Sequence, residues 1–451
     1  MPYRLPSAHN WVVVVGLVSA LGCGPTSGPG AAPGQETGAC IDSRCPAPLV
    51  CLSDLCVDPD ATPSGDTDHD DMGNPGGGDE PSNPSVSILV VVDNSGSMDA
   101  EQAPLSRAIG VLAESLTGAG VDWRIGVTTS DIDNIRCTDT TPEVGRFVLS
   151  SCRSRPERFV FDADPPVEAF EDACAAVCPE GVDVIETTPT SIVGSQDVAS
   201  RPWLQNIGGA TNLPPGLAMT DALGCIVPQG IDGCGFEGQL EAVEQALLRV
   251  DSPTGHNAGF LPPGAQLVVL IATDEADCSA NPAWHTIFSP GGARVFWSDD
   301  TAPEPTSAVC WNAGVSCSGS GVYDQCYSID LDANGDVVDD APQTRAVLHP
   351  LSRYLERLAE IDGAMLALIV GAQSDGSVVY QDALGDAEFQ TAFGIGPGCT
   401  SANGDAVPPV RMRELAEWVD GQGWANVSSI CDESYEEPIL ELANAIISRL
   451  G

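Results

Sequence analysis

The stretch of sequence that decides the fold reads Val91-Val92-Asp93-Asn94-Ser95-Gly96-Ser97-Met98, at the end of an apolar run that starts at Val86. A continuously apolar segment is typical of a strand buried on both faces, as in a parallel sheet with helices on each side. Directly after it, Asp93, Ser95 and Ser97 place a carboxylate and two hydroxyls on alternate positions of a short loop. Oxygen donors of this kind are ligands for Mg²⁺, Mn²⁺ or Ca²⁺.

A second apolar strand ends in the same way. The run from Leu267 to Ala272 is followed by Thr273-Asp274-Glu275, and Asp131 and Asp133 follow a third predicted strand, from Val121 to Thr129. Strands that alternate with helices predict a doubly wound, mostly parallel sheet, in which ligands bind at the carboxyl ends of the strands. Asp93 and Asp274 are both predicted to lie at that edge.

An Asp-x-Ser-x-Ser loop between a strand and a helix, together with a second strand that ends in an acid, resembles the metal-ion-dependent adhesion site of von Willebrand factor type A domains. The resemblance runs from about Ser85 to the C-terminus. It implies an α/β fold of that type and a divalent cation held by Asp93, Ser95, Ser97 and Asp274. It also implies an open coordination position that is completed by a carboxylate from a protein partner.

The family supplies one more ligand, a threonine from a glycine-rich loop ahead of a helix. Gly208-Gly209-Ala210-Thr211-Asn212-Leu213 matches that local pattern, and Thr211 is therefore the predicted ligand. The loop Gly230–Glu237 competes with it, because it precedes the helix that leads to the Asp274 strand. That loop holds no threonine, so Asp232 or water would take the place of the hydroxyl there.

The composition indicates a secreted or surface protein. The 451 residues include 64 acids and 18 bases, for a formal net charge of −46, which excludes a nucleic-acid role and repels anionic membranes. The same charge attracts cations and repels acidic partners at long range. A chain with 43% hydrophobic residues can bury a core, and its length allows two or three domains or one enlarged by insertions.

The N-terminus is typical of an export signal. Arg4 supplies positive charge, and the apolar segment from Trp11 to Leu21 is too short to span a bilayer. Ala20-Leu21-Gly22-Cys23 resembles a bacterial lipobox, so residues 1–23 are predicted to be a signal peptide that ends at a lipidated Cys23. The predicted location is the cell envelope, as an outer-membrane lipoprotein attached through its lipid alone, or as a secreted protein.

Changes in amino-acid composition along the chain predict the boundaries of its segments. We predict a flexible tether at 24–38, a small disulfide-rich module at 39–57, an acidic linker at 58–84, and a main domain at 85–451 with insertions at about 136–205 and 280–343. Of the 17 cysteines, 17 − 1 = 16 remain after Cys23, which predicts up to eight disulfides in an exported chain. Cys399 and Cys431 are one predicted pair.

Within the second insertion, Asp330, Asp332, Asn334 and Asp336 resemble the first half of an EF-hand loop. The twelfth position is Ala341 rather than a glutamate, and Asn334-Gly335 is a strong hairpin signal. We therefore expect a hairpin or a weak Ca²⁺-binding turn at this segment.

No catalytic motif accompanies the acids. The sequence has neither a His-Glu-x-x-His motif nor a Gly-x-Ser-x-Gly elbow. The predicted function is therefore binding of a protein partner through the cation, without enzyme activity. One alternative is a structural surface protein whose metal only stabilises loops, and another is a hydrolase that activates water with Asp93, Asp274 and the cation.

Overall fold

A computed structural model describes residues 50–52, 55–57, 84–163, 165–192, 198–402 and 404–451. The chain divides into two compact units, Met1–Gly77 and Gly78–Gly451. In the first unit, β1 (Val50–Leu52) pairs with β2 (Leu55–Val57) as an antiparallel hairpin. The predicted signal peptide, its Cys23, the tether and nearly all of the linker lie outside the described residues.

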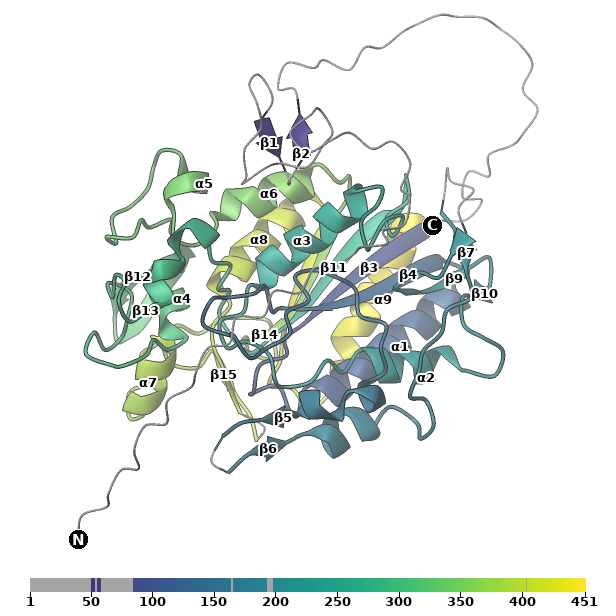
Figure 1. Ribbon diagram of the computed structural model, residues 1–451, viewed down its shortest axis with the longest axis horizontal. Helices are drawn as coiled ribbons and strands as arrows, with labels where there is room; N and C mark the ends of the chain where they lie inside the picture. The colour runs from purple at the N-terminus through teal and green to yellow at the C-terminus, as the bar shows by residue number, and fades with distance from the viewer. Residues whose placement is uncertain (1–49, 53–54, 58–83, 164, 193–197, 403) are drawn as a thin grey trace, which may run out of the picture. The chain divides into compact units, whose positions relative to one another are not determined.

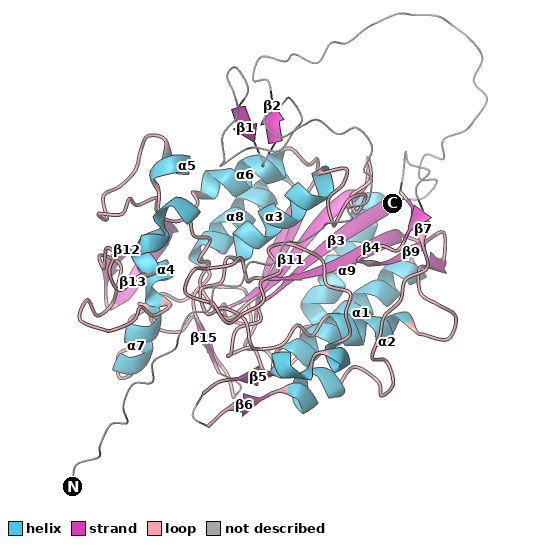
Figure 2. Ribbon diagram, in the orientation of Figure 1, coloured by secondary structure: helices cyan, strands magenta, loops and turns pink. Residues whose placement is uncertain are grey.

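The second unit is built on a seven-stranded sheet (Figures 1 and 2). The five strands β4, β3, β11, β14 and β17 run parallel, and the edge strands β9 and β10 are antiparallel to their neighbours. In spatial order the strands are β10 (Ala210–Thr211), β9 (Leu204–Ile207), β4 (Asp122–Thr129), β3 (Ser85–Val92), β11 (Gln266–Ala272), β14 (Met365–Val370) and β17 (Trp424–Ser429). The predicted α/β class with a largely parallel sheet is confirmed.

Helices cover both faces of this sheet (Figure 1). Side chains alternate along a strand, so Ile88 and Val90 of β3 pack with one helix layer, while Leu89 and Val91 pack with the other. Both faces are therefore apolar, which explains the uninterrupted hydrophobic run. The first layer contains α1 (Gln102–Gly118), α2 (Met219–Ile226) and α9 (Glu436–Leu450), and the second contains α3 (Gln239–Asp251), α6 (Leu351–Ala359) and α8 (Val410–Gln422).

The strand order reverses direction between β3 and β11. From β3 the chain crosses to β4 on one side, and later returns to β11 on the other side of β3. The last residues of the two strands, Val92 and Ala272, are paired, and the backbone N–H of Asp93 donates to the carbonyl of Ala272 at 2.9 Å. Asp93 and Asp274 thus follow neighbouring strand ends at a topological switch point, where open α/β sheets bind their ligands.

Three long connections carry small additional elements. Between β4 and β9 lie η1 (Cys152–Ser154), η2 (Pro156–Phe159), β5 (Val160–Phe161), β6 (Val167–Glu168), η3 (Phe170–Ala175), β7 (Thr190–Ser191) and β8 (Val198–Ala199). Between β11 and α6 lie η4 (Pro282–Phe288), α4 (Ala308–Gly314), β12 (Val315–Ser320), β13 (Val322–Ser328) and α5 (Pro342–Arg345). The third connection, between β14 and α8, was not predicted; it holds α7 (Ala387–Phe393), β15 (Cys399–Thr400) and β16 (Asp405–Ala406).

Disulfides tie these connections to the sheet and to one another. The predicted pair Cys399–Cys431 is confirmed. The other pairs in the described part of the chain are Cys137–Cys234, Cys152–Cys174, Cys178–Cys225, Cys278–Cys310 and Cys317–Cys326. Disulfides in this number are a property of extracellular and surface proteins. Among the helices that the structure describes, none has both the length and the hydrophobicity of a membrane crossing.

The EF-hand-like segment forms a tight turn. Oδ1 of Asp332 accepts hydrogen bonds from the backbone N–H groups of Asn334 and Asp336, at 2.8 and 3.2 Å, and Leu331 bridges to Val337. Gly335 sits at a φ of 83°, a conformation that favours glycine. The segment is a hairpin turn, as its Asn-Gly pair predicts. Ca²⁺ binding by Asp330, Asp332, Asn334 and Asp336 stays a prediction.

Candidate metal centre

The loop after β3 folds around a fully buried carboxylate, that of Asp93. Its Oδ1 accepts a hydrogen bond from the backbone N–H of Ser95 at 2.8 Å. Its Oδ2 accepts one from the hydroxyl of Thr273 at 2.5 Å. Because Thr273 directly follows β11, this contact joins the two strand ends through their side chains. Sequence reasoning did not assign a role to Thr273.

Four of the five predicted ligands lie together. The hydroxyls of Ser95 and Ser97 are 3.1 Å apart, and the hydroxyl of Ser97 also hydrogen bonds with the carboxyl group of Asp274. A continuous series of polar contacts therefore runs from Asp93 through both serines to Asp274. Asp93 and Ser95 are buried, whereas Ser97 is exposed, so this group reaches the protein surface on its Ser97 side.

The structure does not bring Thr211 to this group. Thr211 is an exposed residue of the edge strand β10, and it pairs with Asn206, which in turn pairs with Trp123. Trp123 is level with Val86, six residues before the end of β3, so Thr211 lies about 20 Å from that end along the strand direction. The prediction for Thr211 is therefore corrected: a local glycine-rich pattern outweighed the position of the loop in the fold.

The competing loop, Gly230–Glu237, lies against the β3 tip. The backbone N–H of Gly233 donates to the carbonyl of Asn94 at 2.8 Å, and that of Gly238 donates to Ser130 at 3.0 Å. A side chain at Gly233 would come within 2.4 Å of the Asn94 side chain, so this close approach requires glycine. Asp232, the residue expected to replace the hydroxyl, lies 3.4 Å from Arg158 instead.

Glu237 is a candidate residue of this site that the sequence reasoning missed. Its carbonyl accepts from the backbone N–H of Cys278 at 2.7 Å, and its side chain is fully buried. Neither carboxylate oxygen meets a donor in good hydrogen-bond geometry, and the neighbouring group is another acid, the carboxyl group of Glu275. Burial raises its pKa well above the usual range, and the nearby charges of Asp93, Glu275 and Asp274 raise it further. Its position could have indicated this role, because Glu237 is an acid just ahead of the helix that leads to the Asp274 strand.

Asp93, Glu237, Asp274 and Glu275 form what we call the buried acid cluster. Burial raises the pKa of each carboxyl group, most strongly for Glu237, Asp274 and Glu275, where the neighbouring carboxylates add to the effect; for Asp93, hydrogen bonds with Thr273 and Ser95 partly offset the rise in pKa. No arginine or histidine in the described residues forms an ion pair with any of the four. Several buried carboxylates without a counter-charge cost free energy unless a proton or a cation neutralises them.

The donors present fit a hard divalent cation. Carboxylates and hydroxyls are the oxygen ligands that Mg²⁺, Mn²⁺ and Ca²⁺ prefer. The buried Oδ1 of Asp274 has no hydrogen-bond partner and is available to such an ion, while the unpartnered Oε1 and Oε2 of Glu237 leave a buried negative charge that a nearby ion would offset. Within the described residues, however, no three acidic groups converge within 4.8 Å of one another. The cation would therefore take at most two carboxylates directly, and hydroxyls and water would supply the remaining ligands.

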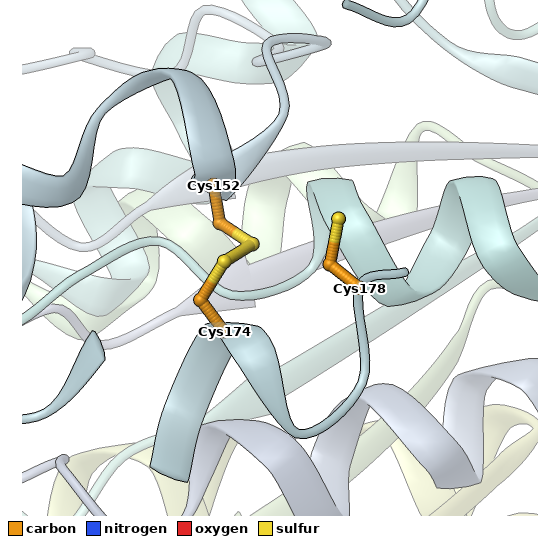
Figure 3. Close-up of side chains that lie close together, drawn as sticks. All are labelled: Cys152, Cys174 and Cys178. Atoms are coloured by element: carbon orange, nitrogen blue, oxygen red, sulfur yellow. A yellow bond between two sulfur atoms is a disulfide. The ribbon is translucent and has the colours of Figure 1, made fainter. Parts of the chain in front are cut away.

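A group of three cysteines meets that distance criterion but is not a metal site. The Sγ atoms of Cys152, Cys174 and Cys178 lie within 4.8 Å of one another. Figure 3 shows Cys152 joined to Cys174, with Cys178 beside them, and Cys178 is bonded to Cys225. Metals bind the thiolate form of cysteine, and none of these sulfurs is free to ionise. The two disulfides link η1, η3 and α2 to one another.

Comparison with known proteins adds little to this description. No protein-family model and no curated protein sequence matches the chain. Among solved structures it is similar to the open conformation of the pilus adhesin SpaC from Lactobacillus rhamnosus GG (TM-score 0.31, 13% identity, 82% of this chain and 31% of that chain). It is also similar to the conserved hypothetical protein BatB from Bacteroides thetaiotaomicron (TM-score 0.26, 10% identity, 81% of this chain and 99% of that chain).

The chain spans about a third of the adhesin's length. At these scores neither similarity bears on function, which has to be argued from the residues of this chain. Those residues define an exported α/β protein with a largely parallel sheet and a buried acid cluster at its topological switch point.

Thr273→Val is expected to lower the free energy of unfolding by about 1.5 kcal/mol. The hydroxyl donates to Asp93 and accepts from the side-chain amide of Gln239 at 2.8 Å and from the backbone N–H of Glu275 at 3.1 Å, so its loss removes a hydrogen bond from three buried groups. Thr129→Val is the matched control, because the buried Thr129 hydroxyl makes no hydrogen bond and its removal should cost little. Urea unfolding of the three proteins measures the difference. Equal losses for both variants would contradict a positioning role for Thr273.

Thr211→Ala is expected to leave cation binding unchanged, within about 0.5 kcal/mol, because an exposed edge-strand residue makes little contribution to a distant site. The measurement is the Ca²⁺-dependent increase in melting temperature of the variant beside that of the parent. A loss of this increase in Thr211→Ala would restore Thr211 as a ligand and would place the metal centre elsewhere.

Proposed function

We propose that this protein binds one divalent cation at the carboxyl ends of β3 and β11 and, through that cation, a carboxylate of a protein partner. The observation that carries the proposal is the buried acid cluster: both carboxylate oxygens of Glu237 and Oδ1 of Asp274 have no hydrogen-bond partner, and among the described residues no basic side chain pairs with the cluster. The carboxylates of Asp93 and Asp274 and the hydroxyls of Ser95 and Ser97 would hold the ion. Glu237 and Glu275 would add negative charge around it.

The accessible side of the centre supports a role in recognition. Ser97 is exposed, and a cavity of about 230 Å³ is lined by Ser97 and Asp274. Glu237, on the inner side, is fully buried. A partner's carboxylate would therefore approach from the side of Ser97. The bound cation would supply the local positive charge that overcomes the repulsion of a chain with a net charge of −46.

The resemblance to the type A adhesion site supports the proposal for Asp93, Ser95, Ser97 and Asp274. Glu237 departs from it, since it occupies the topological place of a neutral threonine. An additional carboxylate strengthens the hold on the cation. It also lowers the net positive charge that the ion presents to a partner. We infer that this centre binds its cation tightly and its partner's acid weakly.

The alternative is that the cation only stabilises the loops. The complete burial of Asp93 and Glu237 favours it, because an ion bound there would join the ends of β3 and β11 and lie beside the Gly230–Glu237 loop. In that case removal of the cation would lower stability without a specific loss of partner binding. We propose no catalytic reaction for this site, and we propose that the lipid on Cys23 is the only attachment to a membrane.

The test is a pull-down from a surface proteome with the full chain, run in Mg²⁺ plus Ca²⁺ and again in EDTA. Parent and Asp93→Ala are compared, and each protein's folding is checked by circular dichroism. A partner retained by the parent with cations, and lost both in EDTA and in Asp93→Ala, is the expected result. A partner that stays bound in EDTA to protein that is still folded would refute cation-dependent recognition and would leave the structural alternative.

A further inference from the structure

The cavity beside the proposed cation has acidic walls contributed by several elements. We call it the acidic cavity. Its lining includes the loop after β3, the start of α1, β6, the β15–β16 hairpin and the end of β17, which the Cys399–Cys431 disulfide links to that hairpin. The acids that line it are Asp99, Glu101, Asp274 and Asp405, and no basic residue does so.

Glu101 shows that this cavity is more than a group of exposed acids. The Glu101 side chain lines the cavity but is only 7% exposed, and its Oε2 has no hydrogen-bond partner. Asp274, 9% exposed, lines the same cavity, and because its unpartnered Oδ1 is assigned to the cation, Glu101 is the buried acid left without a partner there. Burial is the main reason that the pKa of Glu101 rises to about 7, and the nearby charges of Asp99 and Asp93 contribute. Both carboxyl groups lack a positive counterpart within the described residues.

We propose that the acidic cavity binds a primary ammonium group, a lysine side chain of the same partner whose carboxylate completes the cation. This inference rests on the proposed function and specifies its partner: a segment that carries an acid and, close to it, a lysine. The protein itself contains no lysine, so a lysine ammonium group has to come from another molecule.

The size and the other walls of the cavity fit a single side chain. Its volume of about 230 Å³ is below the roughly 300–1,000 Å³ of pockets for drug-sized ligands. Val167, Ala406 and Ile430 add apolar surface beside the acids. Lysine buries its four-carbon stem along apolar surface while its ammonium head pairs with carboxylates.

A lysine on the partner would also offset the repulsion between an acidic partner and this acidic protein. A partner that offered only a carboxylate would be repelled by Asp99, Glu101 and Asp405 as it approached the cation. A partner with a neighbouring ammonium group would bring a compensating charge to those acids. Opposite charges of this kind act mainly on specificity and association rate, so the acidic cavity would select among acidic partners.

The test uses synthetic peptides in which one aspartate and one lysine are separated by one to four glycines, with blocked ends. Binding to the full chain is measured by fluorescence polarisation in Ca²⁺ plus Mg²⁺. For the best peptide, replacement of its lysine by norleucine, which keeps the stem and removes the charge, is expected to weaken binding at least tenfold. In Glu101→Gln the same replacement should change binding less than threefold. Asp405→Asn, in the β15–β16 hairpin that also lines the cavity, provides a second variant if Glu101→Gln does not fold.

The outcomes separate the two proposals. If norleucine binds as well as lysine, while replacement of the peptide's aspartate by asparagine or addition of EDTA abolishes binding, the ammonium site is wrong and the proposed function stands. If asparagine and EDTA have no effect while norleucine weakens binding, the cavity binds an ammonium group and the cation-dependent function is wrong. If no peptide binds at millimolar concentration, the inference is overturned.

Discussion

Asp93→Ala is expected to weaken Ca²⁺ binding at least about 100-fold, or roughly 2.7 kcal/mol. Asp93 lies at the centre of the site: it is fully buried, and its oxygens contact the Ser95 backbone and the Thr273 hydroxyl. Its removal takes away one of the two carboxylates that can reach the ion directly. In the parent, Ca²⁺ at 100 times its dissociation constant should stabilise the fold by about 2.7 kcal/mol. For a folded unit of this size that corresponds to an increase of about 3.5 °C in melting temperature, which the variant should not show.

The control for this prediction has to account for the chain's net charge of −46, since any salt screens self-repulsion. The comparison is therefore made at constant ionic strength, with Na⁺ in place of Ca²⁺. Asp93→Asn, which keeps the shape of the side chain, tests whether the loss comes from the charge or from a cavity. An equal Ca²⁺-dependent increase in Asp93→Ala and in the parent would show that the ion binds elsewhere, for example at Asp330–Asp336.

Glu237→Gln is expected to stabilise the metal-free protein by about 2 kcal/mol and to reduce the additional stability gained from Ca²⁺. A buried carboxylate whose oxygens have no partner costs free energy when it is ionised, and glutamine removes that charge with little change of shape. The measurement is the free energy of unfolding in EDTA and in Ca²⁺. The matched control is Glu241→Gln, a buried glutamate whose Oε2 lies 3.1 Å from Arg353 Nε. Neutralising Glu241 should destabilise the protein.

The raised pKa of Glu237 also determines how the stability of the parent and of Glu237→Gln should depend on pH. The folded protein raises the pKa of Glu237, so between about pH 4.5 and that raised pKa the folded state holds a proton that the unfolded state has lost. The metal-free parent should therefore lose stability as the pH rises above about 4.5 and until it passes the raised pKa. The slope should be shallower in Glu237→Gln. If the free energy of unfolding fell equally steeply with pH in the parent and in Glu237→Gln, the proton retained by the folded state would not be on Glu237.

The sequence predicts where the two strand ends of this site lie, because the pattern that indicates them extends over a whole segment rather than a single residue. An apolar run that ends abruptly in oxygen-bearing side chains, as at Val92–Asp93 and Ala272–Asp274, determines both a buried strand and the place where its polar end lies. Parallel pairing then brings the two acids together without any knowledge of loop geometry. The lengths of the flanking helices follow from apolar spacing in the same way, as in α3 and α9.

The remaining ligand could not be predicted in this way. Thr211 has the better local pattern, yet it belongs to an edge strand that runs antiparallel and presents it near the opposite end of the sheet. Glu237 has no distinctive local pattern, and its burial depends on backbone contacts of Gly233 and Gly238 with residues more than 100 positions away. The spacing of residue types along the sequence does not indicate which residues so far apart will be in contact. The β15–β16 hairpin, which closes the acidic cavity, was missed for the same reason.

Anomalous diffraction from crystals grown with Mn²⁺ would locate the bound ion itself. We expect one strong peak within coordinating distance of oxygens from both the Asp93–Ser97 loop and Asp274, with Glu237 beside it, and no such peak in crystals of Asp93→Ala. Ordered Asp93 and Asp274 side chains with no peak between them, or Mn²⁺ bound only at Asp330–Asp336 or another acidic segment, would show that the ends of β3 and β11 do not form a cation site.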